Sequence, residues 1–192
     1  MSRVRQNAIT TALCAAVLMC RVAVAADSPE AEAVEAAFIY RFAGYVEWPP
    51  ESVSHPEFTI AVLGADKVAQ ELLRILPQHQ IKDRPARVRR IRRMAELGDS
   101  QILFIGPQYD DDLQSVIAQV ANRPVLVVTA GPHGLEDGSC VNFLFIDRHV
   151  RFEVSITAAE HVGLRISAEL LSVAVRIQGR SLGNSPAAVG AR

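Results

Sequence analysis

The chain has 192 residues, of which 49% are hydrophobic, and its formal net charge is −1 at pH 7. This size and composition suit one ordinary globular domain, and the near-neutral charge does not favour a nucleic-acid-binding protein. The five histidines are scattered without zinc-site spacing, and neither a G-x-G-x-x-G motif nor a Walker lysine is present. We therefore expect no catalytic residues, no metal and no cofactor, which argues against an enzyme.

Residues 1–26 have the pattern of a secretory signal. Arg3 and Arg5 precede an apolar run that is well short of the roughly 20 residues needed to span a membrane. The sequence Ala23-Val24-Ala25 then supplies a small-x-small cleavage site. We expect residues 1–26 to be removed on export, leaving a single domain over residues 27–178.

Cleavage would leave Cys140 as the only cysteine, so no internal disulfide could form. The apolar neighbours Val141 and Phe143 favour a buried thiol. Residues 179–192 are mostly Gly, Ser, Pro and Ala, a composition that predicts a disordered tail.

Residues 27–46 predict a helix that is apolar nearly all round and that ends before Pro49 and Pro50. Such a helix packs in a core or is covered by a partner. Packing on a sheet is the more ordinary interpretation, and whatever the core leaves uncovered would form a recognition surface. The candidate partner contacts in this stretch are Phe38, Arg41, Phe42, Tyr45 and Trp48.

Continuous apolar runs at 58–63, 101–105 and 124–129 predict strands buried on both faces. They alternate with predicted helices at 66–76 and 110–121, which indicates an α/β fold with a mainly parallel sheet flanked by helices. The pattern then changes to a C-terminal antiparallel hairpin followed by two helices. The hairpin comprises strands 138–146 and 150–156, and the helices cover 157–162 and 167–178.

Six arginines fall within residues 84–93, where a strand is expected. Charged side chains on an edge strand discourage association between sheets, which is the ordinary explanation. The alternative is a docking surface that steers an acidic partner or an anionic lipid, with Arg89 and Arg90 as its candidate residues.

An ordered set of short segments resembles the YfiR family of periplasmic regulators. No single segment is distinctive, but together they cover about residues 33–178. The segments are 36–42, 46–49, 60–64, 84–85, 102–105, 123–126, 138–143, 152–156, 158–159, 162–167 and 170–171.

The resemblance implies a non-catalytic periplasmic protein that binds the periplasmic portion of an inner-membrane diguanylate cyclase of the YfiN type. Inhibition of that cyclase would lower cyclic di-GMP and biofilm formation. The resemblance also implies a homodimer and a small ligand such as tryptophan or GMP. Of the implied ligand-binding positions this chain keeps only Arg165, because Glu47 and Ser167 stand where the family has an arginine and a histidine.

Two other functions remain open from the sequence. One is a periplasmic ligand-binding sensor module that serves a histidine kinase or an uptake system. The other is a small hydrolase whose site has no recognisable motif.

Overall fold

The protein is described by a computed structural model covering residues 29–53, 55–76 and 80–179. The predicted signal, residues 1–26, and residues 180–192 of the predicted tail lie outside the described residues. The single domain expected over residues 27–178 stays a prediction.

The fold is built on a sheet of eight strands in the order β10-β8-β7-β6-β5-β2-β4-β3. The neighbouring strands from β4 to β7 pair in parallel, and β8 pairs antiparallel with β7. This confirms the predicted α/β class with a mainly parallel sheet. The central strands are β2 (Phe58–Leu63), β4 (Arg84–Ile91), β5 (Ile102–Ile105), β6 (Leu126–Ala130), β7 (Val141–Ile146) and β8 (His149–Ser155).

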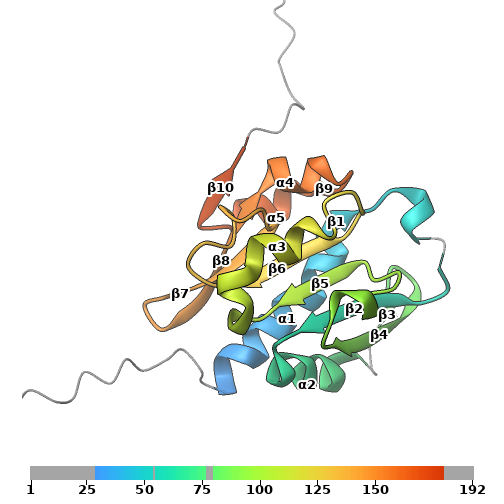
Figure 1. Cartoon of the computed structure of the whole chain (residues 1–192), viewed down its shortest axis with the longest axis horizontal. Coiled ribbons are helices and arrows are strands. Elements are labelled where there is room, and N and C mark those ends of the chain that lie inside the picture. Colours follow the sequence, from blue (N-terminus) through green and yellow to red (C-terminus); the bar gives the residue numbers. More distant parts are fainter. Residues whose placement is uncertain (1–28, 54, 77–79, 180–192) are drawn as a thin grey trace, which may run out of the picture.

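Helices cover both faces of this sheet. Alternate residues of β2 point to opposite faces, so Ile60 and Val62 pack in the core with α1 (Pro29–Tyr45) and α2 (Asp66–Ile75). Ala61 and Leu63 pack in the second core with α3 (Leu113–Ala118). Figure 1 shows α1 and α3 on opposite sides of the sheet. The continuous apolar runs of the sequence are therefore explained by burial on both faces.

The predicted hairpin is confirmed as β7 and β8, which pair from Ile146↔His149 to Val141↔Val154. Asp147 and Arg148, the two residues between the strands, have φ values of 50° and 65°. A two-residue turn with both residues in the left-handed region matches the twist of the flanking strands.

The second C-terminal helix is shorter than expected. The prediction placed it over residues 167–178, but α5 ends at Ser172 and residues 176–178 form the edge strand β10 (Arg176–Gln178). β10 pairs in parallel with β8, and Val175 N donates to Phe152 O at 2.9 Å. The backbone groups of residues 176–178, which the sequence pattern predicted to be helical, instead hydrogen-bond to the edge of β8.

Arg176 fastens β10 to the sheet. Its guanidinium donates to Glu153 on β8 and, at 3.1 Å, to Glu136. Glu153 is buried, and its other oxygen accepts from Asn142 Nδ2 at 2.8 Å. These ion pairs hold the pKa of Arg176 above its usual value.

The remaining elements are short. The helix predicted over residues 110–121 begins as the 3-10 turn η4 (Pro107–Asp112) and continues as α3. The others are β1 (Val46–Glu47), η1 (Pro50–Val53), β3 (Gln80–Ile81), η3 (Met94–Glu96), α4 (Ile156–His161), β9 (Arg165–Ile166) and α5 (Ala168–Ser172). Among the described residues, the structure offers no helix whose length and hydropathy would suit a membrane span.

Candidate functional site

The aromatic residues of α1 belong mainly to the core. Phe42 is fully buried, and its ring lies 5.1 Å from Phe152 and 5.7 Å from Phe143, measured between centroids. Phe38 is half-buried in the same cluster, 5.4 Å from Phe152. The prediction that Phe42 contacts a partner is therefore wrong for the folded protein, because its side chain has no exposed surface.

Trp48 is also buried, which corrects its prediction as a surface contact. Its indole Nε1 donates to Gln101 O at 3.2 Å, and its ring meets Phe58 edge-on at 5.3 Å. Phe58 begins β2, and Gln101 directly precedes β5. Trp48 thus covers the amino end of the parallel strands.

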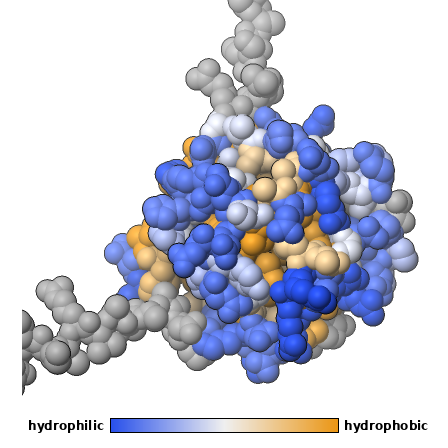
Figure 2. Space-filling view, viewed as in Figure 1, coloured by the Kyte–Doolittle hydropathy of each residue, from blue (hydrophilic) through white to orange (hydrophobic). Residues whose placement is uncertain are grey.

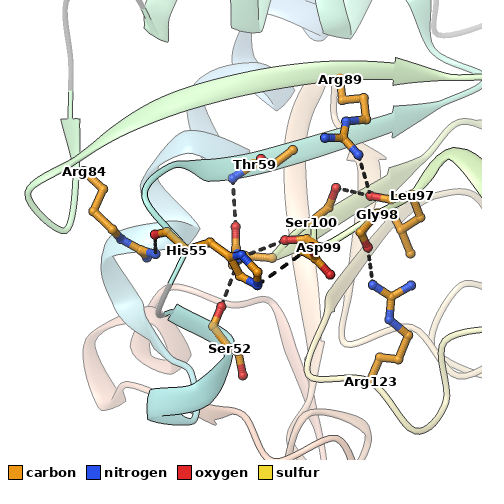
Figure 3. Close-up of polar contacts among 11 residues, drawn as sticks. Ser52, His55, Thr59, Arg84, Arg89, Leu97, Gly98, Asp99, Ser100 and Arg123 are labelled. Carbon is orange, nitrogen blue, oxygen red and sulfur yellow. Dashed lines mark hydrogen bonds and ion pairs between the residues drawn. The ribbon is translucent and has the colours of Figure 1, made fainter.

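Gln101 satisfies backbone groups of Thr59, Ser52 and Asp99, which Figure 3 labels. Its side-chain oxygen accepts from Thr59 N at 2.8 Å, and its amide nitrogen donates to Ser52 O at 3.0 Å and to Asp99 O at 2.9 Å. Gln101 is itself buried. The amino end of the sheet is therefore filled by an indole and by a side-chain amide with both polar atoms bonded.

Five of the predicted site residues meet at the surface of this end. In the pair formed by β1 and β9, Glu47 lies opposite Arg165, and Ser167 N donates to Tyr45 O at 2.9 Å. Tyr45 is 40% exposed, and Arg41 lies one helical turn before it, also exposed. We call this set, Arg41, Tyr45, Glu47, Arg165 and Ser167, the amino-end surface.

Lys82 belongs beside this surface and was missed by the sequence analysis. Its Nζ donates to Val46 O at 2.7 Å and lies 5.4 Å from the centroid of the Trp48 ring. The pKa of Lys82 lies below its ordinary value. Burial is the main cause, the nearby Glu47 carboxylate opposes the decrease, and Arg84 adds to it. With φ values of 51° and 60°, Lys82 and Asp83 form a two-residue turn between β3 and β4. Only knowledge of that turn could have pointed to Lys82.

Arg89 and Arg90 do not form one surface, because adjacent side chains of a strand point to opposite faces. Arg89 is half-buried and donates to the backbone oxygens of Glu96 and Leu97, both at 3.3 Å (Figure 3 shows the contact with Leu97). It therefore supports the turn after β4, whereas Arg90 is exposed. Contact of Arg89 and Arg90 with a partner stays a prediction.

Other arginines of the run also have local partners. Arg87 forms an ion pair with Glu57 at 3.4 Å, and Arg84 donates to His55 O at 3.3 Å. Because β3 pairs only with residues 84 and 85 of β4, most of this strand is a free edge. The ordinary interpretation of the arginines, a charged edge strand, fits this position.

The described residues contain no group of three or more His, Cys, Asp or Glu side chains placed to hold a metal ion. The amino-end surface presents charged and hydrogen-bonding side chains, and the buried Trp48 and Gln101 lie beneath it.

A mixed α/β domain with a mainly parallel sheet is the class that these features define. The chain belongs to the YfiR/HmsC-like family, whose model matches residues 32–175.

A solved structure with a similar fold is the crystal structure of a conserved domain protein from Vibrio cholerae. The TM-score is 0.52 at 12% sequence identity, and the match covers 77% of this chain and 60% of that chain. The chain thus spans less than two thirds of that protein, and the likeness concerns the fold alone. No curated protein was found to match the chain.

Proposed function

We propose that the protein is a non-catalytic inhibitor of an inner-membrane diguanylate cyclase of the YfiN type. It binds the periplasmic portion of that enzyme, lowers cyclic di-GMP and thereby reduces biofilm formation. The observation that carries the proposal is the family match, which spans nearly the whole described domain.

The amino-end surface is the contact that we assign to the cyclase. It combines an exposed tyrosine, a residue type enriched at protein interfaces, with arginines at positions 41 and 165 and a carboxylate at position 47. The frame beneath it is held by Trp48 and Gln101. A contact surface that is already ordered loses little conformational entropy on binding.

Ligand binding by Glu47, Arg165 and Ser167 stays a prediction. Glu47 stands directly across from Arg165. Opposite charges at such a cross-strand position attract one another. This arrangement makes Arg165 a weaker site for a phosphate or carboxylate than an isolated arginine. The homodimer likewise stays a prediction, and the molar mass in solution tests it.

The first test is cellular cyclic di-GMP in the native host. Deletion of the gene should raise it, and expression of the wild-type protein should reverse the rise. An unchanged level after deletion would overturn the proposal and favour the sensor module for a histidine kinase or an uptake system, for which a cavity in the fold is the supporting observation.

A matched pair of variants tests the assigned surface. Tyr45→Ser removes an aromatic ring that is 40% exposed at the amino end, and Ile146→Ser removes an apolar side chain that is 41% exposed at the hairpin turn. Tyr45→Ser should lose repression in the complemented strain, while Ile146→Ser retains it. Equal repression by both variants, at equal protein levels, would show that the cyclase binds elsewhere.

A further inference from the structure

A cavity of about 940 Å³ lies at the carboxyl end of the parallel strands. β2 is followed there by Gly64, β5 by Gly106 and Pro107, and β6 by Gly131. The chain leaves β2 for α2 on one face of the sheet and leaves β5 for η4 and α3 on the other. Such a divergence between neighbouring strands opens the crevice in which open α/β sheets hold ligands.

The loops at this crevice approach each other closely. Gly64 has a φ of +69°, and a Cβ atom on Gly106 would overlap the Gly64 carbonyl. A Cβ on Gly131 would lie 2.7 Å from the Asp110 carboxylate. Glycine at these positions allows the close approach of the loops.

The cavity lining combines apolar and charged side chains. Phe104, Phe143 and Val150 contribute aromatic and aliphatic surface. Leu144 and Phe145 extend that surface toward the hairpin, and Figure 2 shows apolar surface over this end of β7 at the left of the molecule. A cavity of this size and lining suits a small organic molecule.

Glu32 of α1 is the unusual group in the lining. The residue is only 7% exposed, and no described residue donates a hydrogen bond to either carboxylate oxygen. Its ion-pair partner is Lys67, whose Nζ lies 3.0 Å from Oε1 but whose side chain is 60% exposed. A buried carboxylate normally accepts several hydrogen bonds, because its loss of hydration is costly otherwise. Glu32 is therefore short of donors.

The charges around Glu32 favour a cation. Glu35 and Asp66 add two further carboxylates to the lining, whereas Lys67 and Arg92 are its basic residues. Lys67 is already paired with Glu32. An anionic ligand would meet an excess of negative charge in this cavity, and a protonated amine would relieve it.

We propose that the cavity binds a small organic cation that has an apolar body. The ammonium group donates to the Glu32 carboxylate, and the apolar body packs against the apolar lining that Phe143, Leu144 and Val150 contribute. This site lies at the opposite end of the sheet from the amino-end surface and does not depend on the proposed inhibition of a cyclase. The test uses purified protein alone, so its failure would leave the proposed function untouched.

Three probes of nearly equal size separate the contributions of charge and apolar contact. These are 2-phenylethylamine, its neutral analogue 2-phenylethanol and the anion 3-phenylpropanoate, each titrated calorimetrically at pH 7. The amine should bind at least roughly tenfold more tightly than the alcohol, because a charge-assisted hydrogen bond is stronger than a neutral one. The anion should bind most weakly. Equal affinities for amine and alcohol, or no binding of the amine, would overturn the proposal.

Two variants test whether the amine binds in the cavity. Glu32→Gln keeps the side-chain shape and should remove the preference for amine over alcohol, while the exposed control Glu160→Gln on α4 should keep it. Ala130→Leu adds bulk to the cavity wall and should weaken both probes at an unchanged fold, checked by thermal unfolding. An amine preference that survives Glu32→Gln, or binding unaffected by Ala130→Leu, contradicts the assignment.

Discussion

The two ends of the parallel sheet are finished in different ways. At the amino end, Trp48 and Gln101 fill the space between α1 and the strands, and the polar atoms of both side chains are hydrogen-bonded. At the carboxyl end, a cavity remains, and Glu32 is buried there without a hydrogen-bond donor among the described residues. Satisfied polar groups give a rigid support for a surface, whereas the poorly satisfied Glu32 carboxylate is the group to which we assign a ligand.

Gln101→Ala should have the largest effect on stability. It would leave Thr59 N, Ser52 O and Asp99 O without their partner, and we expect a loss of about 3 kcal/mol in the free energy of unfolding. Denaturant titration measures this loss. The control Gln119→Ala removes an exposed amide from the end of α3 and should cost less than about 0.5 kcal/mol. Similar losses in both variants would show that the amino end is not held by this network.

Trp48→Phe should have a moderate effect. Phenylalanine keeps an aromatic ring against Phe58 but cannot donate to Gln101 O, which predicts a loss of about 1 kcal/mol. Repression of cyclic di-GMP should persist, because Trp48 supports the surface without forming part of it. Loss of repression in a variant that remains folded would instead make Trp48 a direct contact.

Glu32→Gln, at the other end, should change stability by less than about 1 kcal/mol. Removing the charge relieves the desolvation of a poorly partnered carboxylate and gives up an ion pair with an exposed lysine. Denaturant titration beside Gln101→Ala compares the two ends directly. A loss near 3 kcal/mol would mean that Glu32 serves the fold rather than a ligand.

The reactivity of the Cys140 thiol tests whether the core stays closed in the native protein. Burial raises the pKa of its thiol to about 11, so very little thiolate is present at pH 8. Native protein should resist alkylation of Cys140 by iodoacetamide, and unfolded protein should react, as read by mass spectrometry of the Cys140 peptide. Rapid labelling in the native state would indicate that the end of the sheet near β7 opens.

The parts predicted well from the sequence are those with a strong local pattern. Residues 58–63, apart from Thr59, and residues 102–105 are apolar because both faces of their strands are covered, and the structure confirms them as β2 and β5. The hairpin was likewise visible from two strands and a short turn. Residues 176–178 were assigned to a helix because the preceding apolar spacing is helical, and the free edge of β8 that recruits them cannot be seen locally.

The site was harder to predict, because hydrophobicity alone does not separate a core residue from an interface residue. Phe42 and Tyr45 are neighbours on one helix, yet the first is fully buried and the second is 40% exposed. The pairing of Glu47 with Arg165 depends on two strands of two residues each, which give no sequence signal. The cavity is lined by residues from segments spread over much of the chain, so no single sequence motif predicts it.

Helix α1 connects the two ends. Along this helix, Glu32 in the cavity lining lies about 20 Å from Tyr45 at the amino-end surface. If α1 moves as a rigid body, a displacement at Glu32 also displaces Tyr45. If an amine repositions Glu32 and thereby alters the fit of Tyr45 to a cyclase, thermodynamic linkage requires that the cyclase alter the affinity for the amine by the same factor. The helix would then couple the two sites, and amine binding could be measured through the affinity for the cyclase.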